Sequence, residues 1–188
     1  MQKIDRDVFN DQLALISDFS IREFTRLCIM SAPDYFFNDA PASSSGKYHP
    51  IDELGWDGCI VHTKKVFVVA YTLSRGLDIE ANRDAILGAC LIHDLIKQGV
   101  KKTGFTVKNH PKLAADLIAT VQDNTQLLDL SDYEIMYNAV LLHYGPWSTK
   151  AIKKPMSKYS LTELCVYISD YIASKKFVTV KYKGDVYE

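Results

Sequence analysis

The chain has 188 residues, of which 47% are hydrophobic and 24% are charged, and its formal net charge is −1. A chain of this length can bury a full core as one domain, and its nearly neutral charge excludes broad electrostatic binding to long nucleic acid. No apolar run reaches membrane-spanning length, and the charged N-terminus is unlike a signal peptide, so we expect a cytoplasmic protein.

Four cysteines lie far apart in separate apolar segments. This distribution predicts reduced core residues with no disulfide partner. They are Cys28, Cys59, Cys90 and Cys165.

The first third of the chain combines helical periodicity with one long loop. Between about residues 5 and 31 apolar residues recur at helical spacing, and Ser20 is the expected cap that divides this stretch into two helices. A loop from about Ala32 to Leu54 follows. Its aromatic residues at 35–37 argue against disorder, and a loop of this length inside a compact domain is usually functional.

The rest of the chain predicts five helices joined by irregular connections. Two are expected over 55–74 and 79–96. A third is expected to begin at Asn109, with that residue as its cap and Pro111 in the tolerated first turn. Two capping-box patterns begin the last two helices, Ser131-x-x-Glu134 and Ser160-x-x-Glu163.

The fifth of these helices is followed by a segment, 177–183, in which apolar and polar residues alternate. This pattern also fits a short strand, either as a hairpin arm or as a contact in a homo-oligomer. The sequence therefore predicts one all-α domain over residues 1–188, a helical bundle with a long loop in its N-terminal half.

Histidine and aspartate residues recur along the expected helices. His93 and Asp94 stand side by side at the end of an apolar run, and adjacent helical residues point about 100° apart, so they share a target only near a helix end or around an ion. An acid on an apolar face costs free energy unless a cation or hydrogen bonds satisfy it. Four further residues belong to the same pattern, namely His62, His110, His143 and Asp170. Together the six residues suggest a cation that is bound from several helices.

The motifs around these residues resemble the HD superfamily of metal-dependent phosphohydrolases. The resemblance covers about residues 43–174 and includes the two additional histidines of the binuclear subgroup. The matching motifs are Gly58-x-x-x-His62-Thr63, His93-Asp94-x-x-Lys97, Asn109-His110-Pro111, Leu142-His143-Tyr144-Gly145 and Ser169-Asp170-Tyr171.

The resemblance implies two divalent transition metals per chain. His62, His93, Asp94 and Asp170 would hold the first, and Asp94 would bridge to a second held also by His110 and His143. Imidazole and carboxylate ligands suit manganese, iron, nickel or zinc. A hydroxide bridging both ions would be the nucleophile, and Lys97 would bind the substrate phosphate as a point charge.

The resemblance further implies hydrolysis of a phosphoester bond in a nucleotide or short oligonucleotide. Single-metal relatives often carry a glutamate where Lys97 stands, which favours the phosphodiester-cleaving branch here. A nucleotidase or nucleoside-triphosphate hydrolase is the alternative activity, and a non-catalytic nucleotide-binding sensor is an alternative of another class. A structural zinc protein is disfavoured because structural sites usually close with cysteine-rich tetrahedra.

Substrate-binding candidates lie mainly in the long loop. Ser45, Lys47 and His49 offer polar groups on the only long loop that precedes a proposed ligand helix, although the loop taken by itself favours a solvated turn. For Lys97, the alternative to binding phosphate is an exposed charge after the end of a helix. Trp147 could stack on a base or pack its loop onto the core. The pairs Lys64-Lys65 and Lys101-Lys102 are expected on solvated faces.

Overall fold

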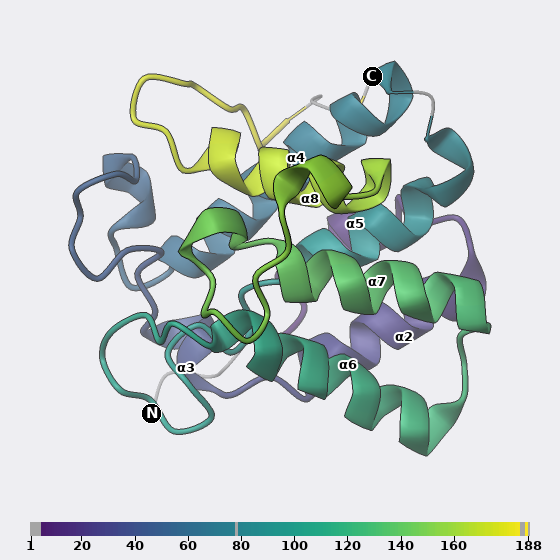
Figure 1. The fold of residues 1–188 in the computed structure, drawn as a ribbon. Helices are drawn as coiled ribbons and strands as arrows, with labels where there is room; N and C mark the ends of the chain where they lie inside the picture. The colour runs from purple at the N-terminus through teal and green to yellow at the C-terminus, as the bar shows by residue number, and fades with distance from the viewer. Residues whose placement is uncertain (1–4, 78, 185–186, 188) are drawn as a thin grey trace.

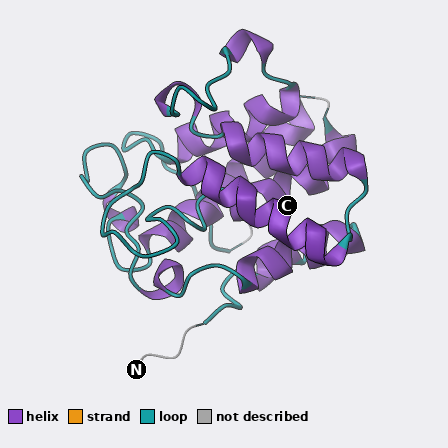
Figure 2. Ribbon diagram, turned by 60° about the horizontal axis from the view of Figure 1, so that its bottom comes forward, coloured by secondary structure: helices purple, strands orange, loops and turns teal. Residues whose placement is uncertain are grey.

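All regular elements of the structure, a computed structural model, are helices. It describes residues 5–77, 79–184 and 187, and Figure 2 shows helices and loops but no strand over these residues. The predicted all-α fold is confirmed, whereas residues 177–183 form no strand. The α-helices are α1 (Asn10–Leu13), α2 (Phe19–Met30), α3 (Tyr35–Asn38), α4 (Gly58–Gly76), α5 (Arg83–Ile92), α6 (His110–Thr125), α7 (Leu130–Leu142) and α8 (Leu161–Ala173). The 3-10 helices are η1 (Ile51–Glu53), η2 (Glu80–Asn82), η3 (Gly145–Trp147) and η4 (Met156–Lys158).

Helix α5 is the centre of the bundle. Residues 85–92 are all buried, as expected of a helix that is apolar on every side, and α5 contacts α2, α4, α7 and α8. A Cβ on Gly88 would lie 2.6 Å from Thr25 Oγ1 in α2 and 2.8 Å from Met136 Cε in α7. A larger residue at this position would therefore displace these two neighbouring side chains. The helix therefore delivers His93 and Asp94 directly from the core.

The other long helices surround α5. α4 packs against α8, and α6 packs against α7, as Figure 1 shows. Most of the long connections lie together at the left of Figure 1. The chain thus gathers its irregular segments at one end of the bundle.

Two helices begin at a different cap from the one predicted. Asp18, not Ser20, caps α2 and accepts a hydrogen bond from the Ile21 amide. Asp129, not Ser131, caps α7. In both cases the aspartate lies two residues earlier than the predicted serine, and its negative charge also interacts favourably with the helix N-terminus. The capping box at Ser160 and Glu163 is present as predicted.

Helix ends near the candidate ligands also differ from prediction. α5 ends at Ile92, four residues before the predicted end, so His93 is its C-cap and Asp94 lies in the following turns. Asn109 occupies the N-cap position of α6, but its side chain makes no capping hydrogen bond. His93 and His110 therefore stand at helix boundaries, where a side chain can point past the end of the helix.

The long loop is fixed to the start of α4. The Ala40 amide donates to the Trp56 carbonyl at 2.9 Å, the Ala42 amide to Glu53 at 2.9 Å, and the Cys59 amide to Ala40 at 2.8 Å. A Cβ on Gly58 would lie only 2.0 Å from the Glu53 carbonyl oxygen, so glycine is required at this contact. The loop is thereby held beside the turn of α4 that carries His62.

The four cysteines are buried as free thiols, in agreement with their predicted core positions. Among the described residues, no helix combines the length and apolar character needed to cross a membrane.

Candidate functional site

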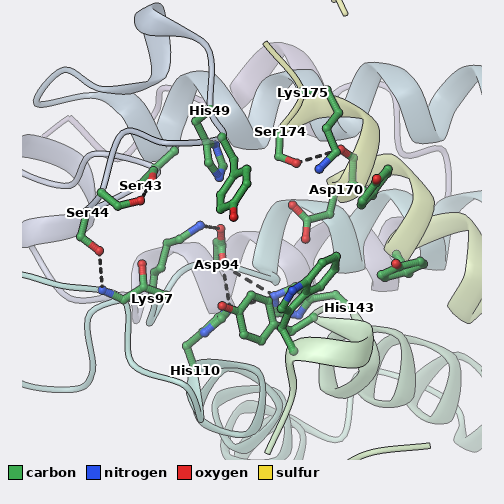
Figure 3. A pocket seen from close by; sticks show the side chains of 18 residues that line it. Ser43, Ser44, His49, Asp94, Lys97, His110, His143, Asp170, Ser174 and Lys175 are labelled. Carbon is green, nitrogen blue, oxygen red and sulfur yellow. Dashed lines mark hydrogen bonds and ion pairs between the residues drawn. The ribbon is translucent and has the colours of Figure 1, made fainter. Parts of the chain in front are cut away.

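Four helices each place one histidine at the same end of the bundle. His62 lies near the start of α4 and His110 begins α6, whereas His93 and His143 directly follow α5 and α7. All four are buried. Together with Asp94 they form what we call the histidine centre, and Figure 3 shows Asp94, His110 and His143 around the adjoining cavity.

Backbone hydrogen bonds orient three of these rings. The Nδ1 atoms of His93, His110 and His143 each contact the carbonyl oxygen three residues earlier in the chain. Those carbonyls belong to Cys90, Val107 and Val140, at 2.7, 2.8 and 2.6 Å. Because a carbonyl oxygen only accepts, each Nδ1 carries the proton and each Nε2 keeps its lone pair for the site.

The carboxylate of Asp94 lies between two pairs of histidines. Its Oδ2 is 3.4 Å from His93 Nε2 and 4.0 Å from His62 Nε2. Its Oδ1 is 3.3 Å from His110 Nε2 and 3.6 Å from His143 Nε2. Two groups with metal-ligand spacing, His62–His93–Asp94 and Asp94–His110–His143, therefore share this carboxylate.

The donor atoms of the histidine centre fit divalent cations. His93 Nε2 and Asp94 Oδ1 are buried without a hydrogen-bond partner, which costs free energy. The Nε2 atoms of His110 and His143 lie 3.1 Å apart, with lone pairs directed at one another. A cation in each group would satisfy these atoms, and imidazole with carboxylate suits manganese, iron, nickel or zinc.

Asp170 reaches the histidine centre through His62 alone. Its Oδ1 lies 2.9 Å from His62 Nε2, and it is not a member of either metal-spaced group. Burial lowers the pKa of His62, but the carboxylates of Glu53 and Asp170 outweigh burial and raise the pKa to about 9. His62 therefore bridges two acids, Glu53 through its Nδ1 and Asp170 through its Nε2.

Lys97 is buried beside Asp94, so its predicted alternative as an exposed charge is wrong. Its Nζ lies 2.5 Å from Asp94 Oδ2. Burial lowers the pKa of Lys97, but the charge of Asp94 outweighs burial and raises it. Burial conversely raises the pKa of Asp94, while Lys97 and His93 hold it well below its ordinary value. The pair is thus fully charged inside the cavity wall.

Glu53 is the site residue that the sequence did not reveal. It is fully buried in η1, and its Oε2 lies 3.0 Å from His62 Nδ1 and 2.7 Å from His49 Nδ1. Its Oε1 lies 2.9 Å from the Nζ of Lys65, which is buried and not solvated as predicted. Glu53 therefore orients His62, as outer carboxylates commonly do for metal-binding histidines. The only sequence signal was its position in the loop just before α4.

A cavity of about 480 Å³ opens beside the histidine centre (Figure 3). Asp94, Lys97, His110, His143 and Asp170 form its inner surface. The long loop contributes a second side, which we call the serine loop (residues 43–49). Ser45 and His49 line the cavity, whereas Lys47 is exposed outside it, with its amine 5.2 Å from the Tyr48 ring centroid.

The third side of the cavity is formed by aromatic residues of η3 and α8 and the turn before η3. Trp147 belongs to this aromatic wall and is 53% exposed, so its predicted alternative of packing a loop onto the core is wrong. Lys101 and Lys102, in contrast, are exposed as predicted. The members of the aromatic wall are Tyr144, Trp147, Tyr167 and Tyr171.

Comparison with known proteins identifies the family through this same region. A family model described as the HD domain matches residues 60–175, more than half of the chain, and this range includes every member of the histidine centre. No curated protein and no solved structure matches the chain. The chain belongs to the HD domain family and so to a superfamily of metal-dependent phosphohydrolases.

Proposed function

We propose that this protein hydrolyses a phosphoester bond of a nucleotide or short oligonucleotide at a centre for two divalent transition metals. The observation that carries the proposal is the position of Asp94, whose two carboxylate oxygens face different pairs of histidines. A carboxylate shared in this way suits two adjacent cations, and paired cations are a recurrent arrangement in phosphoester hydrolysis.

The residues that would hold the first metal are His62, His93, Asp94 and Asp170, and those for the second are Asp94, His110 and His143. When bound, the two metals supply Lewis acidity to the phosphoryl oxygens and lower the pKa of water. The second group offers only three protein ligands, which leaves coordination positions for substrate.

The chain itself provides orientation and charge. The hydrogen bonds to Nδ1 keep the imidazoles of His93, His110 and His143 in the tautomer that ligation requires. Lys97 lines the cavity with a charged amine, which would bind a phosphoryl oxygen next to Asp94. Ser45 and His49 line the same cavity and would contact the rest of the substrate.

The test combines metal analysis with a substrate panel. Mildly purified protein is analysed for metal per chain by mass spectrometry and assayed with phosphomonoesters, phosphodiesters and nucleoside triphosphates in the presence of manganese, iron, nickel or zinc. We expect two ions per chain and release of product from nucleotide substrates, with loss of activity after chelation.

The panel also separates the alternatives. Turnover confined to monoesters or triphosphates identifies a nucleotidase or triphosphate hydrolase. Bound nucleotide without any turnover identifies a sensor. A protein that binds no divalent metal and cleaves no phosphoester contradicts the proposal.

A further inference from the structure

The aromatic wall exposes its two outer rings at the cavity. Trp147 is 53% exposed and Tyr171 is 42% exposed, and both line the cavity that contains Asp94. Their rings are nearly parallel, with an angle of 15° between the planes and 6.2 Å between the centroids. Large aromatic residues normally bury most of their surface, so an exposed pair beside a buried catalytic centre indicates a surface for a ligand.

The backbone holds Trp147 in place before any ligand binds. Gly145 has φ of 54°, and a Cβ there would lie 2.4 Å from the Tyr167 ring, so only glycine fits. The Trp147 amide donates to the Tyr144 carbonyl at 3.2 Å, and the Ser148 amide donates to Gly145 at 3.1 Å. A turn fixed in this way lowers the entropy that is lost when a ligand stacks on the Trp147 ring.

Lys175 adds positive charge to the aromatic wall. Its Nζ lies 3.7 Å from the Tyr171 ring centroid, and Figure 3 shows it on the same side of the cavity as Asp170. No carboxylate in the described part of the chain forms an ion pair with this amine, whereas Lys97 is paired with Asp94. The cavity therefore offers flat rings together with a cation that no carboxylate of the described residues neutralises.

We propose that Trp147 and Tyr171 form a stacking site for the nucleobase of the substrate, and that Lys175 binds the anionic part of the same molecule. Stacking of bases on aromatic side chains is a general mode of nucleotide recognition. The cavity of about 480 Å³ is within the range of small-molecule sites, which suits one nucleotide. This inference rests on the proposed function, because it assigns the base of the nucleotide whose phosphate lies at the histidine centre.

The two tryptophans of the chain allow a direct test. Trp56 is 56% exposed but does not line the cavity, so Trp56→Phe leaves Trp147 as the only reporter, and Trp147→Phe is the matched control. Adenosine 5′-monophosphate and uridine 5′-monophosphate should quench the tryptophan fluorescence of Trp56→Phe. Ribose 5-phosphate, which lacks the base, should not, and the control protein should not respond to the nucleotides.

Calorimetry then measures the contribution of each residue to affinity. Trp147→Ala should weaken adenosine 5′-monophosphate binding by about five- to a hundredfold, with Trp147→Phe intermediate. Lys175→Ala should weaken it too, whereas the exposed Lys101→Ala should not. The base site is overturned if neither nucleotide binds, if ribose 5-phosphate binds as tightly as the nucleotide, or if Trp147→Ala retains wild-type affinity.

These results are distinguishable from failure of the proposed function. Phosphoester hydrolysis that is unaffected by Trp147→Ala would overturn the base site and leave the enzyme standing. Trp147-dependent binding of nucleotide by a protein that hydrolyses no phosphoester would support the base site and contradict the enzyme.

Discussion

The histidine centre and the aromatic wall border one cavity but are held in different ways. The histidine centre is buried at the ends of four core helices, and hydrogen bonds to backbone carbonyls orient three of its rings. The aromatic wall lies partly on a turn and exposes Trp147 and Tyr171. The difference indicates that metal binding is coupled to the packing of the core, whereas recognition of the rest of the substrate is a surface property. Substitutions should therefore separate the two functions.

The largest effect is expected from Asp94→Asn. Loss of the shared carboxylate should lower the content of both metals and reduce turnover by roughly a thousandfold or more, because each metal loses the carboxylate that lies between them. Metal per chain and turnover are measured together, with circular dichroism to verify folding. Retention of two ions with near-normal turnover would show that the proposed centre is wrong.

A smaller and more selective effect is expected from His110→Ala. This histidine belongs only to the second group, so the first ion should remain bound while the second is lost. Turnover should fall by roughly a hundredfold or more if hydrolysis needs both ions. His62→Ala is the matched variant for the first group. Full activity of His110→Ala with one ion per chain would indicate a mononuclear mechanism and support the nucleotidase alternative.

Glu53→Gln examines how the loop contributes to the buried centre. Removing the charge that faces His62 Nδ1 should weaken metal affinity about ten- to a hundredfold, as other substitutions of outer carboxylates do. Asp52→Asn is the control, because Asp52 is exposed and contacts Lys65 but not His62. Metal titration of both proteins measures the effect. An equal loss in Asp52→Asn, or none in Glu53→Gln, would exclude an orienting role for Glu53.

The smallest effect is expected from Lys47→Ala. Because Lys47 is exposed and does not line the cavity, its loss should change KM by less than about fivefold, within the range of exposed charges. Steady-state kinetics on the best substrate of the panel provide the measurement, with Lys97→Ala as the cavity-lining comparison. A rise in KM of tenfold or more would return Lys47 to the substrate-binding residues that the sequence predicts.

The histidine centre could be predicted because each of its residues lies in one of the short motifs that resemble the HD superfamily. His93, His110 and His143 each lie within or beside a short motif, and the structure places each at the end or start of a helix. A motif of this kind specifies the residue type, and its position at a helix end lets the side chain point into the site. The all-α fold and these positions could therefore be predicted without coordinates.

Glu53 and Lys65 could not be predicted in the same way. Glu53 is a single acid in an irregular segment, and Lys65 follows another lysine on a helix, so both resemble solvated residues. Their burial results from the contact of the long loop with α4, which brings Glu53 to His62 across nine residues. Such burial depends on tertiary packing and leaves no periodic pattern in the sequence.

The close contact at Gly58 affects the route by which ligands enter and leave the cavity. The Glu53 carbonyl occupies the space that a Cβ on Gly58 would need, and backbone hydrogen bonds join residues 40–42 to residues 53–59. Separating these two segments would expose the hydrogen bonds to water and detach Glu53 from His62. We therefore expect the base of the serine loop to stay closed during turnover. Ligands would then arrive and depart past the exposed rings of Trp147 and Tyr171, which line the same cavity.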